Sequence, residues 1–122
     1  MPRWGSIVNL SRSGEQIAKV RWCQSFLCRL RGLTFRRSLE QDEGLLLVER
    51  SESRSNTAIH MWMVLFPITA VWLDKDFHVV DMKLAKPWRV YIPSEPAMYV
   101  LEGSAEMMQR LSLGDRLAWR DA

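Results

Sequence analysis

The segment Ile59–Asp74, with the sequence IHMWMVLFPITAVWLD, constrains the fold of this chain more than any other stretch. It is the most apolar part of the chain, with His60 near one end and Pro67 in its middle. A membrane-spanning helix needs about 20 apolar residues, whereas thirteen residues separate His60 from Asp74. Proline also breaks a helix, because it lacks the backbone N–H donor. The segment therefore predicts buried β-structure bent at Pro67, and it predicts no membrane span.

The residues after Pro67 predict a β-hairpin. We expect a strand over 69–74, a polar turn at 75–76 and a second strand over 77–85. The second strand alternates between apolar and charged side chains, which is the period-two pattern of a strand. The part before Pro67 is expected to be a separate short strand or an extended arm, because proline inside a sheet removes a hydrogen-bond donor.

The remaining chain predicts further short strands and two short helices. The expected strands cover 6–10, 16–22, 44–49, 97–102 and 116–120. The expected helices cover 25–32 and 104–111, with Ser25 and Ser104 as N-terminal caps. Three prolines make 87–96 irregular. At 122 residues the chain predicts one domain, 1–122. The expected fold class is α+β, with a mainly antiparallel, curled or barrel-like sheet and two short helices.

The two cysteines, Cys23 and Cys28, are five positions apart. This spacing does not match the Cys-x-x-Cys pattern of redox and zinc sites. Residues five apart on a helix do not share a face, so we expect two reduced structural thiols. The N-terminus has no apolar run long enough for a signal peptide. The sequence therefore predicts a cytoplasmic protein.

Basic residues concentrate in the segment 19–37, which has no acidic residue, within a chain of net charge +3. Such a segment can form a solvated basic face or contact phosphates and acidic partners. The sequence contains no recognisable nucleic-acid-binding motif, so we do not expect nucleic acid as a partner.

Several short motifs follow one another in a fixed order: Arg31-Gly-Leu-Thr-Phe-Arg36, Gly44-Leu-Leu-Leu47, Ile59-His-Met-Trp62, Phe66-Pro-Ile68, Val71-Trp-Leu-Asp74, Pro87-Trp-Arg89, Val100-Leu-Glu102 and Gly114-Asp115. No single motif is specific, but the ordered set resembles the family called domain of unknown function 192, over about residues 10–120. The resemblance implies a small β-rich α+β domain without an established activity. The family's Pro-Ile-Asp is Pro-Ile-Thr here, at Thr69, which argues against an acid–base role for this position.

The candidate ligand-binding residues are His60, Trp62, Arg36, Trp88, Arg89 and Glu102. The imidazole of His60 can shuttle protons, donate a hydrogen bond or ligate a metal, and it can equally be a structural hydrogen-bonding group. The tryptophans, with Trp72, can form the wall of a site or pack in the core. Arg36 can clamp a carboxylate or phosphate, or pair with a structural carboxylate. Glu102 ends an apolar strand and, if partly buried, needs a partner.

These residues favour a binding module, with an aromatic-lined pocket or groove for a small anionic ligand or a peptide. The first alternative is a small hydrolase that uses His60 with Glu102 or Asp74, although no serine or cysteine lies in a known nucleophile motif. The second alternative is a nucleic-acid contact domain that uses 19–37, whose binding would weaken steeply with salt. The sequence predicts no metal site and no cofactor, and it leaves the catalytic residues and the oligomeric state open.

Overall fold

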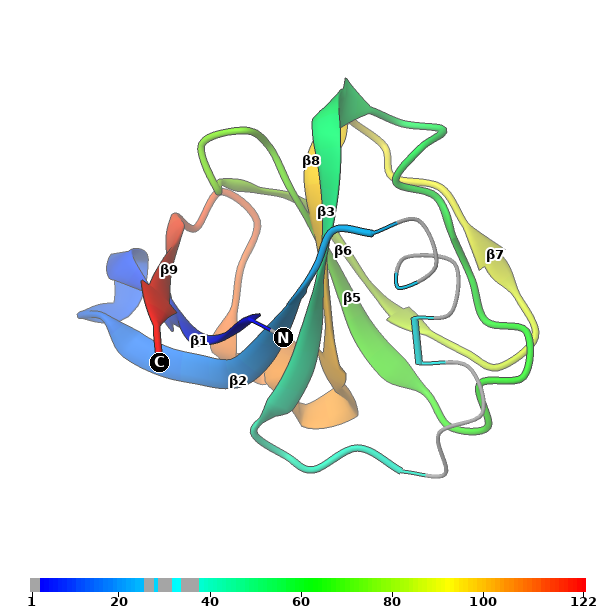
Figure 1. Ribbon diagram of the computed structural model, residues 1–122, viewed down its shortest axis with the longest axis horizontal. Helices are drawn as coiled ribbons and strands as arrows, with labels where there is room; N and C mark the ends of the chain where they lie inside the picture. Colours follow the sequence, from blue (N-terminus) through cyan, green and yellow to red (C-terminus); the bar gives the residue numbers. More distant parts are fainter. Residues whose placement is uncertain (1–2, 26–27, 29–31, 34–37) are drawn as a thin grey trace.

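The computed structural model describes residues 3–25, 28, 32–33 and 38–122 (Figure 1). Nine strands and two short 3-10 helices are assigned within these residues, in the order β1 (Arg3–Asn9), η1 (Leu10–Arg12), β2 (Glu15–Cys23), β3 (Glu43–Ser53), β4 (Ile59–His60), β5 (Ile68–Leu73), β6 (Val79–Ala85), β7 (Val90–Tyr91), β8 (Ala97–Ser104), η2 (Ala105–Arg110) and β9 (Leu117–Asp121). No helix in the described part of the chain is long and apolar enough to cross a membrane.

Seven of the strands form one sheet in the order β6-β5-β8-β3-β2-β1-β9, and β4 pairs with β7 in a second, two-stranded sheet. The large sheet is mixed, because β2 and β3 run parallel whereas its other neighbours are antiparallel. The residues immediately before its two edge strands, His78 and Arg116, form one isolated bridge, so the sheet curls strongly. The prediction of a mainly antiparallel sheet is confirmed. The fold class is corrected to mainly β, with a sheet that does not close into a barrel.

The predicted hairpin is present as β5 and β6. All six residues of β5 are buried, and the strand begins directly after Pro67. Asp74 forms the turn, because its Oδ1 accepts hydrogen bonds from the backbone N–H groups of Asp76 and His78, both at 2.9 Å. A carboxylate that satisfies nearby backbone donors is a common way to fix such a turn.

Some local predictions were wrong. The helix expected over 104–111 is the 3-10 helix η2, and the Ser104 hydroxyl does not cap it but donates to the carbonyl of Gln41 at 3.0 Å. The segment 87–96 is not wholly irregular, because β7 lies between its prolines and contains none of them. Most of the helix expected over 25–32 lies outside the described residues.

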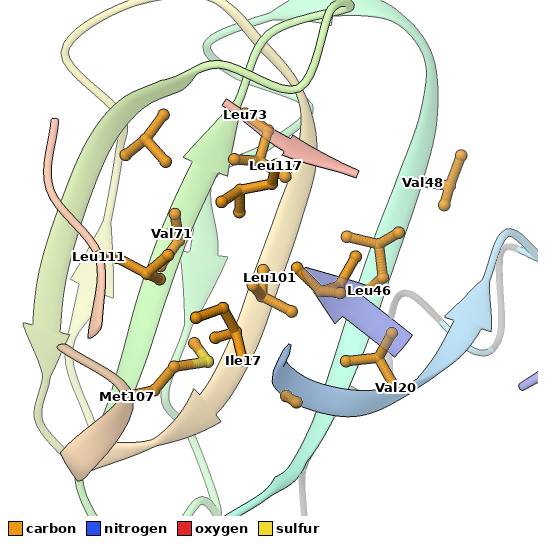
Figure 2. Packing of buried hydrophobic residues seen from close by; sticks show 13 residues of the cluster. Ile17, Val20, Leu46, Val48, Val71, Leu73, Leu101, Met107, Leu111 and Leu117 are labelled. Atoms are coloured by element: carbon orange, nitrogen blue, oxygen red, sulfur yellow. The ribbon is translucent and has the colours of Figure 1, made fainter. Parts of the chain in front are cut away.

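The first hydrophobic core fills the concave side of the large sheet. Figure 2 shows its side chains converging from strands β2, β3, β5 and β8, with Met107 and Leu111 from the segment that follows β8. The buried members are Ile7, Ile17, Ala18, Val20, Leu46, Val48, Val71, Leu73, Val79, Leu101, Met107, Leu111 and Leu117. Burial of this many aliphatic side chains supplies the main driving force for folding.

The second hydrophobic core lies on the other face of the central strands. Alternate residues of β5 and β8 point to it, and residues of and after β4 cover it. Its buried members are Cys23, Leu33, Leu45, Ile59, Met61, Val64, Ile68, Ala70, Trp72, Ala85, Ala97 and Val100. In Figure 1, β7 lies on the side of β3 and β8 opposite to β1 and β9. The two-stranded sheet is therefore anchored on the second core.

The expectation of two reduced cysteines is contradicted, because Cys23 and Cys28 form a disulfide. The helical argument did not apply to Cys23, which is the last residue of β2. The chain turns immediately after this strand and brings the two Cα atoms within 5.6 Å. This distance lies in the usual range for disulfide-bonded residues.

Candidate functional site

One predicted site residue, His60, lies in the two-stranded sheet, and three more, Trp62, Trp88 and Arg89, lie within two positions of its strands. His60 lies opposite Val90, and Ile59 lies opposite Tyr91. Residues directly opposite each other in a sheet project from the same face. Ile59 and Tyr91 face the second core, so His60 and Val90 project from the other face of this small sheet. The His60 ring lies 5.4 Å from the Trp62 ring, centroid to centroid.

Backbone hydrogen bonds extend this pairing toward Trp88 and Arg89. The Met61 N–H donates to the carbonyl of Arg89 at 2.7 Å, and the Trp88 N–H donates to the carbonyl of Met61 at 2.8 Å. Trp62 and Trp88 are therefore held on adjacent segments, although 26 positions separate them in the sequence. They are 55% and 56% exposed, so neither belongs to the core.

Large exposed hydrophobic side chains gather in this part of the chain. We call this set the β4–β7 patch; its members are Trp62, Met63, Leu65, Trp88, Val90 and Ile92. Met63 and Trp88 have positive φ angles of 61° and 68°. The left-handed conformation is uncommon for bulky residues. It costs on the order of 1–3 kcal/mol and tends to occur at functional sites.

The charges next to the β4–β7 patch are positive. Between Asp81 and Glu95 the chain contains Lys83, Lys86 and Arg89 and no acidic residue. Lys83 is engaged, because its Nζ donates to the carbonyl of Ile92 at 3.1 Å and lies 3.7 Å from Asp81. Lys86 and Arg89 are exposed.

His60 has one ring nitrogen without a hydrogen-bond partner. Its Nδ1 is buried and has no hydrogen-bond partner. This observation does not support the alternative of a structural hydrogen-bonding histidine, at least for Nδ1. It also leaves the predicted hydrolase without a hydrogen bond from this atom to a carboxylate. Asp74, one of the two carboxylates considered, is engaged in its own turn.

Glu102 lies in β8, on the large sheet, and not in the two-stranded sheet. Its side chain faces the second core, because it lies opposite Leu45 on β3 and Ala70 on β5. The residue is 5% exposed, and Oε1 has no hydrogen-bond partner. Burial among apolar neighbours raises the pKa of the Glu102 carboxyl from its ordinary value of 4.5 to about 7. From the sequence, a buried Glu102 is expected to have a polar partner, and its Oε1 has none.

The other residues considered in the sequence analysis do not lie near the two-stranded sheet's exposed face or fall outside the described residues. Arg36 lies outside the described residues. Trp72 belongs to the second core, where its indole N–H donates to the carbonyl of Thr57 at 2.7 Å. Thr69, at the family's Asp position, is buried, and its hydroxyl donates to the carbonyl of Ser104 at 2.8 Å. Thr69 and Ala70 are neighbours on β5 and project from opposite faces. The substitution at Thr69 therefore does not alter the face that carries Glu102.

One cluster of metal-ligand side chains occurs among the described residues, formed by Asp74, Asp76 and His78. Their ligand atoms all lie within 4.8 Å of one another, in the turn between β5 and β6. The Asp74 carboxylate already accepts two backbone hydrogen bonds there. We therefore assign this cluster a structural role in the turn.

The sequence analysis missed a cavity on the large sheet. It measures about 600 Å³ and is lined in part by Trp4, Arg21, Glu43 and Leu45. Its residues come from β1, β2 and β3 and from the segment after β2. The side chains of each strand alternate between the two faces, as in any strand, and the cavity forms only where three strands meet. No local pattern in the sequence therefore marks it.

Comparisons with known proteins identify related chains and folds. The model of the DUF192 family, described as "Uncharacterized ACR", matches residues 8–119. A UPF0127 protein from Thermococcus kodakarensis is 36% identical over 115 residues, covering 93% of this chain and 72% of the relative. A UPF0127 protein from Pyrococcus horikoshii is 35% identical over 115 residues, covering 93% of this chain and 97% of the relative.

Two crystal structures share the fold. A Sinorhizobium meliloti protein, described as a candidate transcription regulator, has a TM-score of 0.83 at 23% identity and covers 98% of this chain and 94% of its own. A protein of unknown function from Novosphingobium aromaticivorans has a TM-score of 0.77 at 16% identity, covering 97% of this chain and 85% of its own. At these identities the likeness concerns the fold alone.

Proposed function

We propose that this chain, which belongs to the DUF192 family, is a binding module that holds an extended acidic peptide segment of a partner protein on the β4–β7 patch. The observation that carries the proposal is the concentration of six large exposed hydrophobic side chains in and beside one two-stranded sheet. Contiguous exposed apolar surface on a soluble protein marks an interaction site, and tryptophan is enriched where binding energy concentrates.

The backbone of the small sheet supports a peptide as the occupant. Within the described residues, β4 and β7 pair only with each other, so each has an outer edge without a neighbouring strand. An extended peptide can add to such an edge through main-chain hydrogen bonds, with alternate side chains held by the adjoining surface. Trp62 and Trp88 supply large, rigid contact areas for those side chains.

The charges support an acidic peptide. Lys86 and Arg89 are exposed beside the β4–β7 patch, and no acidic residue lies between Asp81 and Glu95. Carboxylates flanking the apolar side chains of a peptide would meet these cations. The half-buried ring of His60 lies beside the Trp62 ring and extends the surface for contact with the peptide.

A peptide-display selection tests this function. Random dodecapeptides are panned on the wild-type chain, with W88A as the matched variant that loses one anchor and W4A as a tryptophan control outside the β4–β7 patch. We expect enrichment of sequences that combine apolar and acidic residues, with binding that W4A retains and W88A loses at least tenfold. Failure to enrich any sequence would contradict the proposal. So would a wild-type dimer in solution that W88A converts to a monomer, because the patch would then bind a second copy.

A further inference from the structure

The cavity on the large sheet has the size of a small-molecule site. Its volume is about 600 Å³, within the roughly 300–1,000 Å³ typical of ligand pockets. It is distinct from the β4–β7 patch, since none of the patch residues lines it. Leu33, Leu39 and Leu45 supply apolar walls, and Trp4 adds an aromatic ring.

Strand register aligns four side chains across this site. Trp4 pairs with Arg21, Arg21 pairs with Leu45, and Leu45 pairs with Glu102. These residues form one row over β1, β2, β3 and β8, and they project from the same face of the sheet. The first three line the cavity, and Glu102 is the next member of the row. Neighbouring strands lie about 4.8 Å apart, so the Cα atoms of Arg21 and Glu102 are about 10 Å apart.

Glu102 provides a buried polar group behind the cavity wall. A Cβ atom added to Gly32 would lie 3.5 Å from Glu102 Oε1, and Gly32 itself lines the cavity. Oε1 is buried without a hydrogen-bond partner, and the residue is 5% exposed. Buried polar atoms in folded proteins are almost always hydrogen-bonded. Because Oε1 has no exposed surface, Glu102 acts on a ligand in the cavity through its negative charge and not through direct contact.

Arg21 favours a negatively charged group on the ligand. Its side chain is exposed and makes no hydrogen bond or ion pair with any residue that the structure describes. A guanidinium group presents donors in a planar fork that matches a carboxylate. Arg21 disfavours a ligand that is only a cation, whereas Glu102 disfavours a ligand that is only an anion.

We propose that this cavity binds a small zwitterion, an amine and a carboxylate joined by a short apolar body. The carboxylate meets Arg21, the apolar body lies against Trp4 and Leu45, and the ammonium group lies at the Gly32 end of the cavity, nearest the buried carboxyl of Glu102. This proposal does not rest on the peptide function, because it uses a different face and different residues.

Isothermal titration calorimetry with four probes tests the zwitterion site. 5-Aminopentanoate and leucine carry both charges, pentanoate lacks the amine, and pentylamine lacks the carboxylate. We expect saturable binding of at least one zwitterion, with both single-charge probes at least tenfold weaker. The two zwitterions differ in charge separation, so the tighter one also gives the spacing of the site.

Substitutions of Arg21 and Glu102 test whether this cross-strand row binds the zwitterion. R21Q and the isosteric E102Q should each weaken the zwitterion at least tenfold, whereas R116Q, which removes an exposed arginine outside the cavity, should leave its affinity unchanged. Circular dichroism establishes that each variant is folded. The proposal is overturned by absence of saturable zwitterion binding to the wild-type chain, by equal affinity for pentanoate, or by unchanged affinity in folded R21Q. Peptide binding to W4A is measured in parallel, which separates failure of this site from failure of the peptide function.

Discussion

Arg21 and Glu102 occupy the same cross-strand row of the large sheet, two strands apart, with Leu45 between them. The opposite charges therefore do not pair directly in this row. An adjacent cation would lower the pKa of a carboxyl, whereas burial raises the pKa of Glu102 to about 7. The row thus combines an unpaired exposed cation with an unpaired buried carboxyl.

The first prediction concerns the pH dependence of stability. The pKa of Glu102 is raised on folding, so the neutral carboxyl is favoured in the folded state and its ionised form is disfavoured. The stability it contributes is present below about pH 4.5 and is lost as the pH rises to about 7. E102Q keeps the shape and cannot ionise. Relative to wild type, E102Q should gain roughly 3 kcal/mol in free energy of unfolding between pH 4.5 and pH 8.

Urea denaturation at a series of pH values measures this difference. Contributions of the other titratable groups largely cancel between the two proteins. A difference in unfolding free energy that stays constant over this pH range would show that Glu102 ionises normally in the folded protein.

The second prediction concerns Thr69. Its buried hydroxyl donates to the carbonyls of Ser104 and Ala105, at 2.8 and 3.2 Å, and thereby ties β5 to the start of η2. T69V keeps the shape and leaves these carbonyls without that donor, so it should lower the free energy of unfolding by about 1–3 kcal/mol. T69S retains the hydroxyl and serves as the control in chemical denaturation. Equal stability of T69V and wild type would mean that this hydrogen bond contributes nothing.

The third prediction concerns the disulfide between Cys23 and Cys28. Thiol titration of the denatured, unreduced chain should find no free thiol, and reduction should release two. C28S should lower stability by roughly 2 kcal/mol, because the crosslink restricts a short loop of the unfolded chain. Two free thiols without reductant would contradict the structure. The result also bears on the expected cytoplasmic location, because disulfides persist mainly in oxidising compartments.

Local patterns were sufficient to predict much of the sheet. Alternation of polar and apolar residues identified β6, and Pro67 marked the start of the apolar strand β5 that pairs with it. The polar turn predicted at 75–76 is present, and Asp74, the last residue of the predicted strand, fixes it by accepting hydrogen bonds from nearby backbone groups. β4 and β7, with two residues each, are too short to produce a detectable period.

The candidate sites depend on contacts distant in sequence. Trp62 and Trp88 were both selected as site residues, but the pairing of Met61 with Arg89 that holds them together has no local signature. The row from Trp4 to Glu102 depends on the register of four strands, including the parallel pair β2–β3, which no local pattern specifies. The disulfide was missed because the turn after Cys23 was taken as part of a helix.

The indole ¹H–¹⁵N resonances of the six tryptophans test the central claim most directly. Trp62 and Trp88 report on the β4–β7 patch, Trp4 reports on the cavity, and Trp72 is an internal reference because its indole is buried and bonded to Thr57. Titration with the enriched acidic peptide should shift the Trp62 and Trp88 resonances and leave Trp72 and Trp4 unchanged. Shifts confined to other tryptophans, or no shift at saturating peptide, would contradict peptide binding on the β4–β7 patch.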